Sequence, residues 1–272
     1  MRTLLPVLVS LLFVGCTYDS NAENAATDAT GDPVETSTTT YGFADPEVER
    51  VYADMMAAMA PGDAWDRTRY LQFDWIFDRG DGNPFVRSHR WDRYTGDYKL
   101  EMTNRQGGAV VAVFNTEAPE QGRVWLDGAL QEGETAAEML DGAHGAYIND
   151  AYWFIMPYKW ADPGVNTRFI GTETDDEGRE WEVVELSFES VGRTPDNQYR
   201  AFVNPETHLM ERWWHFRTAD AEPSAADWTE WTDMGDIMLP LNRPRPDGSR
   251  IHFENVVAAA EVPDGAFSTP GA

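Results

Sequence analysis

The chain has 272 residues, and acidic side chains outnumber basic ones, with 47 Asp and Glu against 21 Lys and Arg. The formal net charge of −26 argues against nucleic acid as a partner, because phosphate binding requires a basic surface. The length is sufficient for one large β-rich domain with a sizeable core. The single cysteine excludes an intrachain disulfide, so the core must supply the stability of the domain.

Residues 1–15, MRTLLPVLVSLLFVG, have the pattern of a signal peptide. Arg2 supplies the positive charge, and Leu4 to Val14 form an apolar run too short for an ordinary membrane-spanning helix. The cysteine, Cys16, closes the sequence LFVGC, which resembles the bacterial lipobox. That resemblance implies a lipid-modified Cys16 that anchors the mature chain, because two or three acyl chains give stable membrane attachment. An ordinary cleaved secretory signal is the alternative.

Residues 16–43 are predicted to be a disordered tether between the lipid and the domain, because small, polar and acidic residues dominate them without periodicity. A helix is predicted next. Asp45 is a suitable N-cap, Pro46 suits the first helical position, and apolar residues recur at helical spacing as far as Met59. Pro61 with Gly62 then ends the helix.

Strand patterns dominate the rest of the chain. Leu71, Phe73 and Trp75 alternate with polar residues and share one strand face. Similar segments, separated by turn signals such as Asp81-Gly82, recur as far as residue 260. Short strands joined by short turns indicate a large antiparallel sheet.

A second helix is predicted within this series, over residues 135–156. Thr135 and Glu138 have capping-box spacing, and Pro157 should stop or kink the helix. Helices within a run of antiparallel strands predict an α+β fold with the helices on one face of the sheet. We expect one domain over residues 44–272.

Two segments resemble a known family. The closing phrase VPDGAFSTP, Val262–Pro270, is similar to the ending common in the lipoprotein-sorting superfamily of LolA and LolB. INDAYWFIMPYKWADPG, Ile148–Gly164, resembles a segment of a LolA-like lipoprotein subgroup with no assigned activity. The resemblance covers roughly Asp45 to Pro270. It implies a large curved antiparallel β-sheet, an incomplete β-barrel, whose helices cover the concave face over an apolar cavity.

Members of this superfamily bind acyl chains or other hydrophobic ligands, so the aromatic residues supply candidates for a cavity lining. Neighbouring residues on a strand point to opposite faces, so only one ring of the Trp213-Trp214 pair can line the cavity. We assign Trp214, which shares a face with Met210 and Phe216. The candidate lining residues are Leu71, Phe73, Trp75, Trp153, Phe154, Met156, Trp160, Met210, Trp214 and Phe216. Whether the segment around Trp153 plugs the cavity or lines its mouth is open.

No residue pattern predicts catalysis or a cofactor. The sequence contains no HExxH, no G-x-S-x-G and no glycine-rich phosphate loop. His208 and His215 point to opposite faces of a predicted strand, so we expect no metal site there. The acidic run Thr174–Gly178 lacks the ligand spacing of an EF-hand and is predicted to be a hairpin tip.

We therefore expect a non-catalytic, lipid-anchored protein of the cell envelope that binds a hydrophobic small molecule or lipid. Thr17 after Cys16 resembles the pattern sorted to the outer membrane in some bacteria, which predicts an outer-membrane protein facing the periplasm. Two other functions fit the same sequence. One is an interaction module that docks an envelope protein or a glycan through exposed tryptophans, and the other is a hydrolase with carboxylates in a polar cleft.

Overall fold

The computed structural model describes residues 39–189 and 196–271, and α1, Pro46–Met59, is the first helix in them. The Asp45 carboxylate accepts a hydrogen bond of 3.0 Å from the backbone N–H of Glu47, so the predicted N-cap is confirmed. Its other oxygen accepts one of 3.0 Å from the backbone N–H of Phe169. This second bond ties the start of α1 to strand β7, Val165–Thr174.

The signal peptide, Cys16 and residues 17–38 of the expected tether lie outside the described residues. The rest of the tether contacts the domain, in contrast to the expected disorder. The ring centroids of Tyr41 and Phe43 lie 4.7 and 5.1 Å from that of Tyr52 on α1. The backbone N–H groups of Tyr41 and Phe43 also donate to the Glu49 carboxylate. Burial of these two aromatic rings against α1 accounts for the difference.

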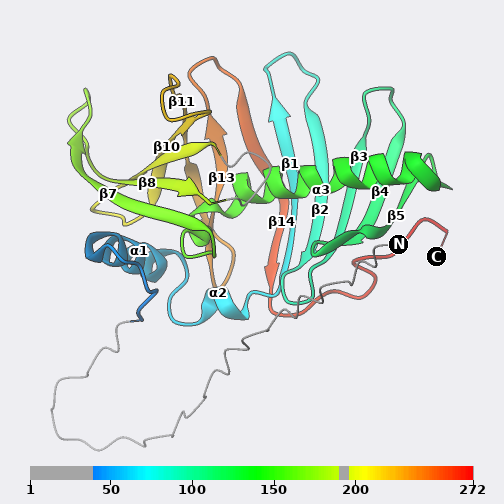
Figure 1. The fold of residues 1–272 in the computed structure, drawn as a ribbon, viewed down its shortest axis with the longest axis horizontal. Helices are drawn as coiled ribbons and strands as arrows, with labels where there is room; N and C mark the ends of the chain where they lie inside the picture. Colours follow the sequence, from blue (N-terminus) through cyan, green and yellow to red (C-terminus); the bar gives the residue numbers. More distant parts are fainter. Residues whose placement is uncertain (1–38, 190–195, 272) are drawn as a thin grey trace, which may run out of the picture. The chain divides into compact units, whose positions relative to one another are not determined.

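Among the described residues the strands form two antiparallel sheets (Figure 1). The nine-stranded sheet has the order β12-β13-β14-β1-β2-β3-β4-β5-β6, and the five-stranded sheet has the order β11-β10-β9-β8-β7. The nine strands of the first sheet are β1 Tyr70–Asp78, β2 Phe85–Asp92, β3 Asp97–Thr103, β4 Ala109–Asn115, β5 Ala118–Leu126, β6 Ala129–Leu130, β12 Thr229–Asp233, β13 Met238–Pro244 and β14 Arg250–Ala259. Besides β7, those of the second are β8 Glu180–Phe188, β9 Gln198–Val203, β10 Met210–Phe216 and β11 Ser224–Asp227.

The chain passes from one sheet to the other at Trp228, the residue between β11 and β12. β11 pairs with β10 of the second sheet, whereas β12 pairs with β13 of the first. The backbone N–H of Trp228 donates to the Glu211 carbonyl at 2.7 Å, and the Trp231 ring donates to the Met210 carbonyl at 3.3 Å. The predicted α+β fold with a large antiparallel sheet is confirmed, and the strands are divided between two sheets at Trp228.

A long helix, α3 Gly133–Ile155, lies across the strands of the nine-stranded sheet (Figure 1). A short 3₁₀ turn, η1 Met156–Lys159, follows it and contains Pro157, where the sequence predicted a stop or kink. A short helix, α2 Ala64–Arg67, links α1 to β1. No helix within the described residues is both long and apolar enough to cross a membrane.

The centre of the core lies between α3 and the strands β1 and β14. The Phe154 ring of α3 lies 4.1 Å from Phe73 and 4.8 Å from Phe253, measured between centroids. All three side chains are buried. Close packing of these rings fixes the helix against the nine-stranded sheet.

Candidate ligand-binding cleft

An open cleft of about 550 Å³ lies between the C-terminal half of α3 and the five-stranded sheet. The side chains of Tyr147, Ile148, Tyr152 and Trp153 line it from α3. The opposite lining comes from β8, β9 and β10, and the loop after η1 contributes Asp162. Small-molecule sites in proteins commonly occupy about 300–1,000 Å³, and this cleft falls within that range.

Aromatic rings form a continuous wall along this cleft. The Tyr199 ring stacks on Trp213 and on His215, with centroid distances of 4.8 and 5.0 Å. Trp153 meets Trp213 edge to face at 4.3 Å, and Tyr152 lies 5.4 Å from Tyr199. These rings offer a large apolar area with few rotatable bonds, which suits a hydrophobic ligand.

A β-bulge determines which ring of the tryptophan pair faces the cleft. The pairing of β10 with β9 shifts register between Met210 and Arg212, which leaves Glu211 as an extra residue. An extra residue reverses the alternation of faces further along the strand. Met210 and Trp213 therefore share the inner face although they are three positions apart, and both belong to the main core cluster.

Trp214 and Phe216 face the other side of the five-stranded sheet. The Trp214 ring lies 4.9 Å from Phe202, and the Arg200 guanidinium lies 5.3 Å from the Phe216 ring. The prediction that Trp214 and Phe216 line a cavity is therefore wrong, because regular alternation does not hold through the bulge.

Trp153 is the one predicted lining residue that borders the cleft. The others of the inner face are almost fully buried in the core and do not reach the cleft: Leu71, Phe73, Trp75, Phe154, Met156, Trp160 and Met210. The physical reason is that α3 and η1 pack directly on the nine-stranded sheet. Their side chains fill the space that the family resemblance assigns to a cavity.

A buried polar cluster beneath α3 joins the helix to β2 and β3. The Arg87 guanidinium approaches both carboxylate oxygens of Asp150 at 2.7 Å. The His89 ring places Nε2 3.1 Å from Asp150 Oδ2 and Nδ1 2.7 Å from the Tyr98 hydroxyl. Sequence analysis missed this cluster. A signal was available, because Arg87 and His89 alternate on one face of β2 and Asp150 lies in an otherwise apolar part of α3.

This cluster contains the residue types of a catalytic Asp-His pair, but its side chains are not accessible to a substrate. The side chains of His89, Tyr98 and Asp150 are all 0 % exposed. Burial lowers the pKa of His89, although the neighbouring Asp150 acts to raise it. None of the three borders the cleft. The cluster therefore holds α3 against the sheet rather than meeting a substrate.

Arg243 of β13 fixes the end of α3 that borders the cleft. This fully buried guanidinium donates 2.9 Å hydrogen bonds to the carbonyls of Pro240 and Trp153, and it lies 3.7 Å above the Trp228 ring. Burial lowers the pKa of Arg243. The negative end of the helix dipole and the ring face compensate for the buried charge. The backbone of Trp153 is thus held while its side chain borders the cleft.

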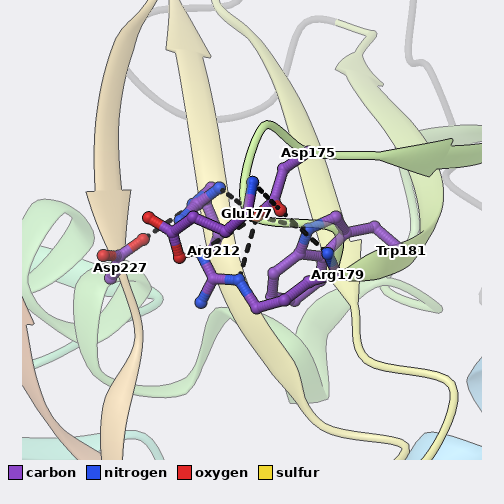
Figure 2. Close-up of polar contacts among 6 residues, drawn as sticks. All are labelled: Asp175, Glu177, Arg179, Trp181, Arg212 and Asp227. Carbon is purple, nitrogen blue, oxygen red and sulfur yellow. Dashed lines mark hydrogen bonds and ion pairs between the residues drawn. The ribbon is translucent and has the colours of Figure 1, made fainter.

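The acidic run between β7 and β8 forms a hairpin turn that is neutralised by arginines. Oδ2 of Asp175 accepts hydrogen bonds of 3.0 Å from Arg179 Nε, 3.1 Å from the Trp181 ring and 3.4 Å from Arg212 (Figure 2). Arg212 also donates to Asp227 of β11 at 2.8 Å. Desolvation raises the pKa of Asp175, but hydrogen bonds from the Arg179 backbone and the Trp181 ring outweigh it and bring the pKa to about 2. Within residues 39–189 and 196–271, no group of three or more metal-ligating side chains could hold a metal ion.

No protein-family model matches the sequence, and no curated protein matches it. Solved structures do. A DUF1329 family protein from Desulfovibrio piger is 14% identical, with a TM-score of 0.45, over 81% of this chain and 97% of that chain. A LolA superfamily protein from Nitrosomonas europaea is 10% identical, with a TM-score of 0.46, over 81% and 96%.

A domain from Vibrio parahaemolyticus, assigned as an outer membrane lipoprotein-sorting protein, is 8% identical, with a TM-score of 0.42, over 80% of this chain and 95% of that chain. This chain is similar to LolA-like proteins. At these identities and scores the likeness says nothing about the ligand or the activity of this chain.

Proposed function

We propose that this chain is a lipid-anchored protein of the cell envelope that binds a hydrophobic ligand without transforming it chemically. The observation that carries the proposal is the open cleft between α3 and the five-stranded sheet, whose lining includes Trp153 and Trp213. Most aromatic side chains are packed in the core away from the cleft, whereas Trp153, Tyr199 and the almost fully buried Trp213 line it. An apolar cleft with a few convergent polar groups is the usual form of a small-molecule site.

The lining of the cleft favours binding over hydrolysis. Asp162 is its acidic residue, and the Asp162 carboxylate forms an ion pair with Lys159. A hydrolase of the kind considered from the sequence requires several carboxylates at the floor of a polar cleft. The aromatic wall and the single paired carboxylate do not supply that arrangement.

The tryptophan positions also weigh against docking through exposed rings. All 11 tryptophans lie within the described residues, and each is buried or only partly exposed. Within the described part of the chain, the large apolar side chains that are exposed are Phe85, Val86, Tyr94, Leu130 and Val257. None of these is a tryptophan, so the proposed partner is a small hydrophobic molecule.

Titration with the fluorescent probe N-phenyl-1-naphthylamine tests ligand binding in the cleft. Wild-type protein should bind the probe saturably. Ile148→Trp places a larger side chain in the cleft and should abolish binding, whereas Val257→Trp, at an exposed position of β14, should bind as the wild type does. Absence of binding to the wild type, or equal binding to Ile148→Trp, would count against the proposal.

The proposed anchor is tested separately. Cys16→Ser removes the thiol to which the lipid would attach, so the protein should move from the membrane fraction to the soluble fraction of the envelope. Retention of Cys16→Ser in the membrane fraction would exclude lipid attachment at Cys16.

A further inference from the structure

Two polar atoms without partners lie at the Trp153 end of the cleft. Tyr152 Oη and His215 Nε2 are buried, and neither has a hydrogen-bond partner among the described residues. Both side chains line the cleft, and the Tyr199 ring contacts both of their rings. Buried polar groups are nearly always paired, so two unpaired atoms in the wall of one cleft indicate a polar group that a ligand supplies.

Positive charge gathers at the same end. The Arg245 guanidinium lies 5.2 Å from the Trp153 ring. Burial lowers the pKa of His215, and the positive charges of Arg217 and Arg245 lower it further. The acidic residue that faces Arg245 is Asp247, whose carboxylate accepts hydrogen bonds from the backbone and hydroxyl of Ser249.

The rest of the lining carries no such excess of charge. Lys159 and Asp162 form an ion pair with each other. Tyr147 and Ile148 precede Trp153 by more than one helical turn, and Trp91 lies 5.4 Å from Tyr147. The positive charge of Arg245 thus lies beside Trp153, whereas the described residues at the end near Tyr147 contribute the unpartnered ring nitrogen of Trp91 but no charged side chain, in a chain with a net charge of −26.

We propose that the cleft binds an amphiphile with a single alkyl chain and an anionic head group. The head lies beside Tyr152, His215 and Arg245, and the chain runs along α3 toward Tyr147 and Trp91. This assignment rests on the proposed function, since it names the class of ligand for the same cleft.

Three probes with the same alkyl chain test the assignment: dodecanoate, dodecan-1-ol and dodecylamine. Each is titrated into the full chain at neutral pH, the two charged probes below their micelle concentrations and dodecan-1-ol below its solubility limit, with isothermal calorimetry as the readout. The overall negative charge by itself favours the cationic amine. The cleft predicts the reverse order, with dodecanoate bound about tenfold more tightly than dodecan-1-ol.

A matched pair of variants locates the head group. Arg245→Gln should weaken dodecanoate binding about tenfold and leave dodecan-1-ol binding unchanged. Arg105→Gln removes the same charge from an exposed turn between β3 and β4 and should change neither affinity. His215→Phe keeps an aromatic ring on Tyr199 but removes Nε2, so it should weaken dodecanoate binding selectively.

The outcomes separate the two proposals. If none of the three probes binds, the proposed function fails. If dodecan-1-ol binds as tightly as dodecanoate, or dodecylamine binds most tightly, the hydrophobic cleft stands and the anionic head group is refuted. If Arg245→Gln does not fold, as judged by thermal denaturation, the order of the probes on the wild type and their response to His215→Phe decide the question.

Discussion

The helix α3 covers two regions that differ in packing. Over the nine-stranded sheet, Phe154 is fully buried against Phe73, and Asp150 is paired with Arg87. Beside the five-stranded sheet, Tyr152 and Trp153 border an open cleft. Successive residues of an α-helix are rotated by about 100°, so Trp153 and Phe154 serve different regions although they are neighbours. The same segment therefore plugs one side of the fold and lines the other.

The largest expected loss of stability comes from a substitution where α3 packs on the nine-stranded sheet. Phe154→Ala should lower the free energy of unfolding by about 3–5 kcal/mol, because the surrounding rings cannot collapse into the space that it leaves. Urea denaturation followed by circular dichroism measures the change. Trp153→Ala is the matched control and should cost clearly less, because the Trp153 side chain already borders open space. Equal costs for Trp153→Ala and Phe154→Ala would remove the distinction between plug and lining.

Substitutions in the buried polar cluster should cause the next largest loss of stability. Asp150→Asn leaves the Arg87 charge and the His89 ring without their carboxylate, and should cost about 3 kcal/mol of unfolding free energy. Arg87→Met in the Asp150→Asn background should cost little more, since the charge that it removes has already lost its partner. Additive costs in this double-mutant cycle would show that the two residues act independently.

Substitutions of the two tryptophans of β10 should have a smaller effect, which is measured as the affinity for the probe. Trp213→Phe should weaken binding of N-phenyl-1-naphthylamine roughly threefold, because a smaller ring contacts less of the ligand. Trp214→Phe should have no effect, since Trp214 packs on Phe202 on the opposite face. The reverse result would place Trp214 in the cleft and contradict the effect of the bulge.

The smallest expected effect is a change in the pH dependence of stability, and it arises in the turn that links β7 and β8. The pKa of Asp175 is about 2 in the folded chain, below its ordinary value of 3.8. Its contribution to stability is therefore complete above about pH 3.8 and is lost as the pH falls toward 2. Asp175→Asn should be less stable than the wild type at pH values above this window and equally stable below it, as measured by urea denaturation at each pH. Asp176→Asn, at the exposed neighbouring position, should match the wild type throughout.

The sequence was sufficient to predict α1, the existence and end of α3, and most strands, because these elements end at clear breakers. The capping box expected at Thr135 and Glu138 is wrong, because α3 begins at Gly133 with Glu132 as its N-cap and no side-chain cap. Asp45 and Pro46 place the start of α1, and Pro157 marks the end of α3. Each signal is local, so tertiary packing was not needed to read it.

The cleft was not predictable in the same way. The bulge at Glu211 reverses the faces of β10, and no residue type in LMERWWHF marks it. The pairing of Asp150 with His89 joins residues that are far apart in the sequence and depends on where α3 crosses β2. Tertiary packing determines whether the aromatic side chains of α3 fill the space beside the sheets or leave a cleft. The periodicity of the sequence carries no information about that packing.

Native mass spectrometry of the protein, extracted gently from its own envelope, tests the central claim most directly. The account predicts that the wild-type chain carries an additional bound mass and that the Ile148→Trp variant, extracted in the same way, does not. A wild-type chain without any bound molecule, or an equally loaded Ile148→Trp variant, would contradict the claim that the cleft lined by Trp153 and Trp213 binds a hydrophobic ligand.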